Sequence, residues 1–129
     1  MTDAELAVVL DRATFSPDGL LPAIVQERGS GTVLMLGYMD REALRRTLTE
    51  GRVTFWSRSR REYWRKGDSS GHVQHVTAAA LDCDADALLV TVEQVGPACH
   101  TGAHSCFDVD PLDPVVGGAP AGGAAEAGA

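Results

Sequence analysis

Residues 20–38, LLPAIVQERGSGTVLMLGY, contain the pattern that decides the fold class of this chain. Two runs of mostly apolar residues, 20–26 and 32–38, flank the turn sequence RGSG at 28–31. Apolar runs separated by a short glycine-containing turn predict a β-hairpin. Pro22 has no amide hydrogen to donate, so we expect the first strand to start at the edge of its sheet.

Working outward from this hairpin, the pattern indicates a strand-rich domain with two short helices. Thr2 and Glu5 have the spacing of a capping box, which predicts a helix to about residue 10. Asp40 precedes an amphipathic segment at 41–50 that Gly51 ends, so a second helix is expected there. Further strands are predicted at 53–57, 73–81 and 87–95.

Composition indicates one globular domain. The chain has 129 residues, of which 44% are hydrophobic, and no stretch approaches the roughly 20 apolar residues of a membrane span. The N-terminus lacks the basic start and apolar run of a secretory signal, so we expect a cytoplasmic protein. The functional domain is expected at 1–114, followed by a disordered Gly/Ala-rich tail at 115–129.

Three cysteines occur in the chain, and an odd number leaves at least one thiol outside any intrachain disulfide. Cys99 and Cys106 bracket a loop that contains His100 and His104, while Cys83 lies in an aspartate-rich segment. Thiolates and imidazoles are zinc ligands, whereas carboxylates suit hard ions such as magnesium. Burial as small hydrophobic residues is the alternative for the loop cysteines, but glycine and proline around them favour a metal site.

Aspartates alternate with other residues around Cys83, at Asp82, Asp84 and Asp86. In an extended segment these carboxylates would face one ion and the thiol another. Alternate residues lie about 6.5 Å apart, which is too far for one small cation, so we expect a bend near Ala85. A plain Asp-rich turn is the alternative. An EF-hand loop is disfavoured because Ala87 stands where that loop needs glycine.

Three thiolates would leave one coordination position of zinc for water, as in a catalytic site. They would also leave that site negatively charged, so a nearby base should help to activate the water. We expect His100 to be this base and His104 to be the second choice, although either could be a hydrogen-bonding loop residue. His72 and His75 are expected to be structural or to face a substrate.

The net charge is −7, which argues against binding nucleic acid by general electrostatics. Basic residues are nevertheless concentrated in one segment, which supplies five of the eleven: Arg58, Arg60, Arg61, Arg65 and Lys66. Such a segment can form a local anion site or a solvated charged loop, and charge alone favours the loop.

The motifs occur in a recognisable order. They are GLLPAIVQ at 19–26, VLMLGYM at 33–39, SRSR at 57–60, WRKG at 64–67, SG at 70–71, DCDAD at 82–86, GPACHTG at 96–102 and SCF at 105–107. In this order and spacing, residues 15–110 resemble the phosphoribosyl-AMP cyclohydrolase family of histidine biosynthesis. His72 departs from the family pattern, in which asparagine is more usual.

This resemblance implies an enzyme that hydrolyses the adenine ring of phosphoribosyl-AMP between N1 and C6. It implies zinc held by Cys83, Cys99 and Cys106, with Cys83 from the other subunit of a homodimer, and magnesium held by Asp82, Asp84 and Asp86. With it we expect an α+β fold: a mixed, strongly bent sheet (a pseudo-barrel) with two short helices and the metal site at the dimer interface. The expected substrate-binding residues are Arg58, Arg60, Trp64, Lys66, Gly67 and Ser70.

Two other classes of function fit parts of the sequence less well. A zinc deaminase would need a His or Cys-x-Glu motif and a Pro-Cys-x-x-Cys pair, and the sequence has neither. A nucleic-acid-binding module could use the aromatic residues that alternate with arginines, namely Phe55, Trp56, Tyr63 and Trp64. The acidic net charge argues against that module.

Overall fold

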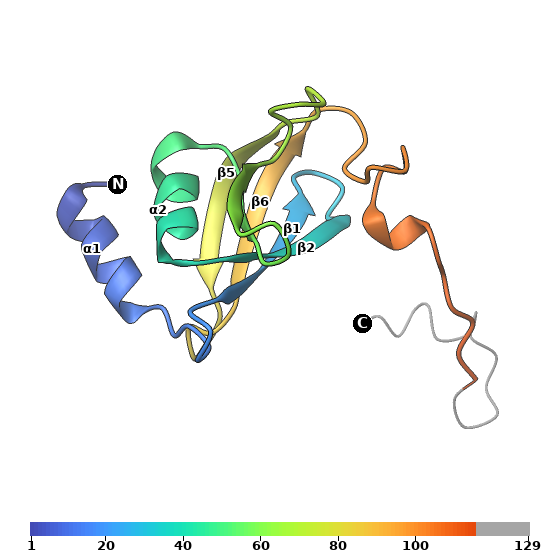
Figure 1. Cartoon of the computed structure of the whole chain (residues 1–129). Helices are drawn as coiled ribbons and strands as arrows, with labels where there is room; N and C mark the ends of the chain where they lie inside the picture. Colours follow the sequence, from blue (N-terminus) through green and yellow to red (C-terminus); the bar gives the residue numbers. More distant parts are fainter. Residues whose placement is uncertain (116–129) are drawn as a thin grey trace.

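The computed structural model describes residues 1–115, which form two helices, six strands and one short 3-10 helix (Figure 1). In chain order these are α1 (Asp3–Arg12), β1 (Leu21–Glu27), β2 (Val33–Met39), α2 (Arg41–Glu50), β3 (Thr54–Ser57), β4 (Glu62–Arg65), β5 (Gln74–Leu81), β6 (Leu88–Gln94) and η1 (Cys106–Asp108). The strand-rich α+β class and the first hairpin are therefore confirmed.

Four strands form a mixed sheet in the order β2-β1-β6-β5. β1 runs antiparallel to β2 and parallel to β6, while β5 and β6 form an antiparallel hairpin. β3 and β4 pair only with each other among the described strands. A single bridge between Arg52, just before β3, and His75 joins the β3–β4 hairpin to β5.

The expected pseudo-barrel is wrong for this chain. The four-stranded sheet is open, because its outer strands β2 and β5 do not pair with each other. The four-residue strands β3 and β4 do not close it either, because they form a separate two-stranded sheet. Phe55 of β3 packs on Gly37 of β2, where an added Cβ would lie 2.5 Å from the phenyl ring.

The expectation for Pro22 is confirmed for the start of β1, although β1 as a whole is a central strand. Pro22 lies opposite Tyr38 of β2, and parallel pairing with β6 begins one residue later, at Ala23. The missing amide hydrogen therefore falls outside the β1–β6 ladder. A proline is tolerated at the start of a strand for this reason.

One face of the sheet forms the core together with α2. Along β1 and β6 every second side chain is buried: Leu21, Ala23 and Val25, then Leu88, Val90 and Val92. The helix contributes the buried side chains Ala43, Leu44 and Thr47. Its predicted limits are confirmed, since the Asp40 carboxylate accepts a hydrogen bond from the amide of Ala43 and Gly51 is the C-cap.

Two predictions concern the ends of the chain. The capping box of the first helix is confirmed, with Thr2 as N-cap and Glu5 bonded back to it. The predicted disordered tail at 115–129 lies outside the described residues, apart from Val115, so the domain boundary stays a prediction. In the part of the chain that is described, no helix has the length and apolar character needed to cross a membrane.

Candidate active site

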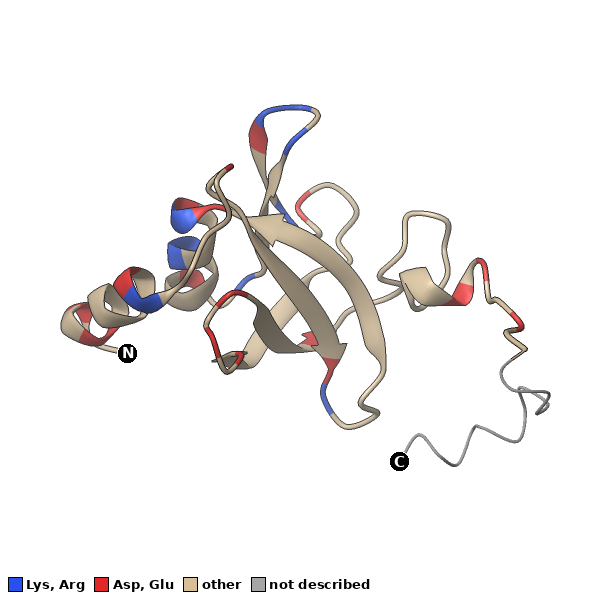
Figure 2. Ribbon diagram, turned by 90° about the horizontal axis from the view of Figure 1, so that it is seen from below, with Lys and Arg blue, Asp and Glu red and all other residues tan. Residues whose placement is uncertain are grey.

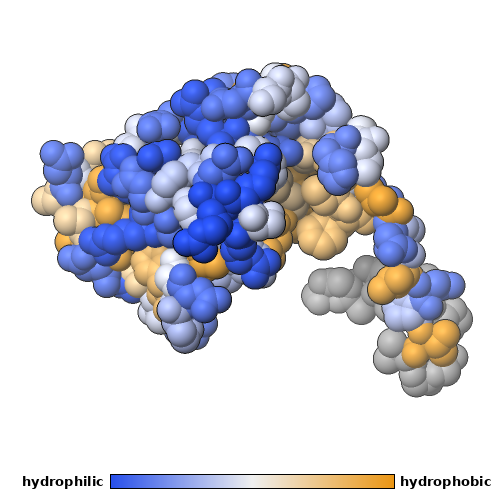
Figure 3. Space-filling view, in the orientation of Figure 1, coloured by the Kyte–Doolittle hydropathy of each residue, from blue (hydrophilic) through white to orange (hydrophobic). Residues whose placement is uncertain are grey.

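A cavity of about 510 Å³ lies between the β3–β4 hairpin, the turn that follows β4 and the loop that follows β6. Seven residues predicted for the site line it: Arg60, Trp64, Lys66, Gly67, Ser70, Cys99 and His100. Basic residues mark the β3–β4 hairpin in the charge-coloured ribbon (Figure 2), and hydrophilic side chains cover much of the face shown in Figure 3. The structure therefore brings together most of the predicted substrate-binding residues and the predicted base.

Lys66 connects two walls of this cavity. Its side chain is buried at 9% exposure, and Nζ donates a hydrogen bond to the backbone oxygen of Ala98. The same ammonium group lies 5.2 Å from the centroid of the Trp64 ring. Lys66 is thus part of the wall rather than of a solvated charged loop, and it fixes the segment that leads to Cys99.

Cys99 and Cys106 form a thiol pair beside this wall. Thr101 Oγ1 donates to Cys99 Sγ at 3.1 Å, and this hydrogen bond lowers the pKa of the Cys99 thiol. Burial, and then the hydrogen bond with Cys99, raise the pKa of Cys106. Two thiols that lie close enough to shift each other's pKa can bind one soft metal ion, which displaces their protons.

The loop that carries these thiols is tied to the sheet at several points. The amides of Ala98 and Cys99 donate to the carbonyls of His104 and Ala103 at 3.0 and 3.1 Å, which closes the loop on itself. Ser105 Oγ donates to the backbone oxygen of Val33 at 2.7 Å. The loop is therefore a fixed part of the fold.

The two histidines of this loop differ in their surroundings. His100 lines the cavity next to Cys99. His104 Nε2 lies 2.9 Å from Glu27 Oε1 at the end of β1, and His104 does not line the cavity. This geometry favours His100 over His104 as a group that can reach a bound substrate. His75 lies on β5, opposite Glu93 of β6, and also outside the cavity.

Arg58 lies outside this cavity. It lines a neighbouring one of about 570 Å³, which shares Arg60 and Trp64 with the first. Its guanidinium carbon stands 4.3 Å from the centroid of the Tyr38 ring. Two adjoining hollows with arginine in their walls can accept two anionic groups.

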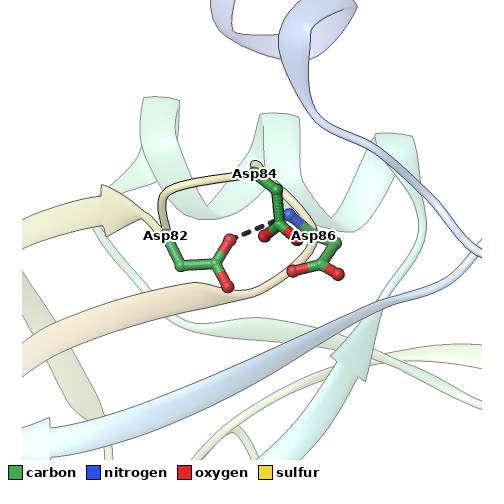
Figure 4. A group of neighbouring side chains, drawn as sticks. All are labelled: Asp82, Asp84 and Asp86. Atoms are coloured by element: carbon green, nitrogen blue, oxygen red, sulfur yellow. Dashed lines mark hydrogen bonds between the residues drawn. The ribbon is translucent and has the colours of Figure 1, made fainter.

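The aspartate segment forms the turn between β5 and β6, with its bend at Ala85, where φ is 62°. One carboxylate oxygen from each of Asp82, Asp84 and Asp86 lies within 4.8 Å of the others, and Figure 4 shows the three groups turned toward one another. Asp82 Oδ1 also accepts the Asp86 amide at 2.9 Å. The expected bend is confirmed, and an EF-hand helix is absent since β6 follows.

The crowded negative charge of this turn shifts the pKa values of two of its carboxyl groups. Hydrogen bonding with Asp84 and then Asp82 raises the pKa of Asp86 to about 6. Burial acts to raise the pKa of Asp82, but hydrogen bonds from Asp86 outweigh it and the pKa is lowered. A cluster of three carboxylates in which the pKa of one is raised suits a hard cation, which would offset the crowded negative charge.

Cys83 does not join the other two cysteines within one chain. It is exposed in the β5–β6 turn, whereas Cys99 follows the opposite end of β6. The seven residues of β6 span about 20 Å, so the two ends are far outside the reach of one metal ion. Within residues 1–115 the aspartates are the one group of three metal-binding side chains that lie together.

The aromatic residues of the hairpin pack against one another. Phe55 is 1% exposed and lies 5.3 Å from Trp64 between ring centroids. Trp56 and Tyr63 meet edge to face at 4.9 Å. Stacking on several unpaired bases needs free ring faces, so this arrangement does not favour a nucleic-acid-binding module.

Sequence reasoning missed Tyr63 in the cavity wall and left open whether His72 is structural or faces a substrate; both residues line the cavity. Tyr63 donates from its hydroxyl to Asp40 Oδ2 at 2.8 Å. Burial and this hydrogen bond raise the pKa of Tyr63 to about 12, so its hydroxyl stays protonated at neutral pH. Two aromatic residues lie between two charged ones over Glu62–Arg65, so the strand that presents Tyr63 has no alternating pattern in the sequence.

Replacing Lys66 by methionine should loosen the loop after β6. The buried Ala98 carbonyl would lose its partner, so we expect the free energy of unfolding to fall by about 1–3 kcal/mol and the amides of Ala98 and Cys99 to exchange faster. Urea denaturation and hydrogen exchange measure these effects. Arg60→Met is the control, because that side chain is 63% exposed and contacts Glu62 instead. Equal losses in both variants would contradict the assigned role of Lys66.

Comparison with known proteins agrees with this arrangement. A family model described as phosphoribosyl-AMP cyclohydrolase matches residues 35–108. A protein named phosphoribosyl-AMP cyclohydrolase from Clavibacter michiganensis subsp. michiganensis is 70% identical to this chain, over 88% of this chain and 86% of the relative. The relative in Leifsonia xyli subsp. xyli is 67% identical over 86% of this chain and 89% of its own length. The chain belongs to the phosphoribosyl-AMP cyclohydrolase family.

Proposed function

We propose that this protein hydrolyses the N1–C6 bond of the adenine ring of 1-(5-phosphoribosyl)-AMP in histidine biosynthesis. The product is the ring-opened phosphoribosylformimino-aminoimidazole carboxamide ribotide. The observation that carries the proposal is the cavity that His100 and Cys99 line together with basic residues, in a chain that is 70% identical to a relative of that name. In this cavity His100 can interact with an attacking water, and the basic residues can bind an anionic nucleotide.

His100 is the group that we assign to proton transfer. It would accept a proton from the water that attacks C6, and the proton would pass to N1 as the N1–C6 bond breaks. Its place next to Cys99 in the cavity supports this role. His104 is the weaker candidate because Glu27 already occupies its Nε2.

The basic residues are assigned to the two phosphates of the substrate. Arg60 stands in both cavities, and Arg58 lies in the second, so their guanidinium groups can pair with phosphate oxygens. Lys66 adds positive charge from inside the wall. The main chain at Gly67 and the hydroxyl of Ser70 lie in the turn that borders the same space, and Trp64 offers part of its ring.

Zinc would be held by Cys99 and Cys106 of one chain and by Cys83 of a second copy. The effect of the first two thiols on each other's pKa and the remote position of the third support this division. Bound zinc lowers the pKa of a coordinated water and so supplies a nucleophile at neutral pH. The protein would then act as a homodimer whose cysteines stay reduced, as they do in the cytoplasm.

Magnesium would be held by Asp82, Asp84 and Asp86. If Cys83 of a second copy enters the site, the neighbouring aspartates enter with it, because all four residues belong to one turn. A cation there would offset both the crowded carboxylates and the charge of a substrate phosphate. A bound cation would in this way allow an acidic protein to bind an anionic nucleotide.

The activity itself is the first test. Incubation of the purified protein with phosphoribosyl-AMP should change the ultraviolet absorbance as the purine ring opens. A strong zinc chelator should abolish the change, and added zinc should restore it, because the thiol ligands alone do not supply the nucleophile. Absence of turnover by the zinc-loaded protein would refute the proposed function.

His100→Ala tests the assigned base. Loss of a positioned proton acceptor should lower kcat by roughly 10²- to 10⁴-fold, while zinc content measured by atomic absorption stays that of the wild type. His104→Ala changes a histidine of the same loop that lies outside the cavity, and we expect a loss of less than about tenfold. Normal turnover in zinc-loaded His100→Ala would show that another group transfers the proton.

A further inference from the structure

His72 lines the same cavity as His100, and its backbone is held on both sides. Its amide donates to Ser70 Oγ at 3.1 Å, and its carbonyl accepts a hydrogen bond from Gln94 Nε2 at 3.3 Å. Gln94 Oε1 in turn accepts from Nε2 of Gln74, a residue that is fully buried, at 2.8 Å. The core of the sheet therefore fixes the place from which the imidazole enters the cavity.

Gly96 fixes the direction of that imidazole. A Cβ at position 96 would lie 2.6 Å from His72 Cδ2 and 3.1 Å from Nε2, so the ring rests directly on the glycine backbone. A methyl group could not share this space, and the ring would have to move. Gly96 begins the segment that continues to Cys99 and His100, so His72 lies beside the residues assigned to the chemistry.

The ring nitrogens of His72 have no partner in the described part of the chain. Every hydrogen bond recorded for this residue within 1–115 uses its backbone. The ring is half-buried, in a wall that also carries Lys66 and Ser70. A side chain with fixed orientation and free polar atoms that faces a cavity is suited to binding a ligand there.

We propose that His72 contacts the bound substrate by a hydrogen bond to its nucleobase, and that Gly96 is a positioning residue for His72. The nucleobase is the assigned partner because His72 borders the Cys99–His100 segment, whereas the arginines assigned to phosphate lie on the β3–β4 hairpin. This inference rests on the proposed function.

Kinetics and nucleotide binding of matched variants test it. One lost hydrogen bond should lower kcat/KM about tenfold in His72→Ala, and His72→Asn, which keeps a polar side chain, should recover part of the loss. Gly96→Ala should cause a similar loss by displacing the ring. In the His72→Ala background, Gly96→Ala should add little, because no ring remains to be displaced.

Gly51→Ala is the control for backbone strain. Gly51 and Gly96 have φ of 71° and 69°, but nothing lies within 4 Å of a Cβ added at Gly51, which ends α2 outside the cavity. Both alanine variants should lose similar thermal stability. Only Gly96→Ala should lose kcat/KM and bind AMP, the probe for the nucleobase half of the substrate, about tenfold more weakly in calorimetry.

The outcomes separate the two claims. Turnover by the wild type tests the proposed function, whatever the variants do. If His72→Ala matches the wild type in kcat/KM and AMP affinity, or if Gly51→Ala and Gly96→Ala lose these equally, the inference is wrong. If the wild type binds AMP but does not turn over phosphoribosyl-AMP, the function fails and the AMP affinities alone decide the role of His72.

Discussion

The length of β6 is the constraint on which the organisation of this site depends. The strand separates the turn that carries Cys83 and the aspartates from the loop that carries Cys99 and Cys106. A rigid strand of seven residues cannot bring its own ends together. If the three thiolates bind one zinc ion, the third must come from another molecule, and the active site exists only in an assembly of copies.

The remaining site is built on the other end of the same sheet. The bridge between Arg52 and His75 places the β3–β4 hairpin beside β5, and the buried Lys66 joins this hairpin to the loop after β6. Hydrogen bonds to the β1 and β2 strands fix the far side of that loop. Substrate binding thus uses short segments that the sheet holds in place, as is common for functional loops on a rigid scaffold.

Local signals in the sequence predicted most of the fold. The capping residue Asp40 and the terminal Gly51 gave the limits of α2, because both act within one turn of the helix. Pro22 indicated the edge position of the start of β1, but not the central position of the rest of the strand, which is set by distant pairing with β6. The strand at Glu62–Arg65 was not predicted, because two aromatic residues between two charged ones give no alternating pattern.

Residue chemistry predicted which residues belong to the site, but not where the fold places them relative to one another. Spacing along the chain could not show that Lys66 is buried or that Cys83 stands apart from its partners. Mixing of Cys83→Ala with Cys106→Ala tests the shared site most directly. After subunit exchange, verified by native mass spectrometry, mixed dimers would each contain one complete site, so the account predicts recovery to about one quarter of wild-type activity. No recovery would contradict it and place the zinc ligands within one chain.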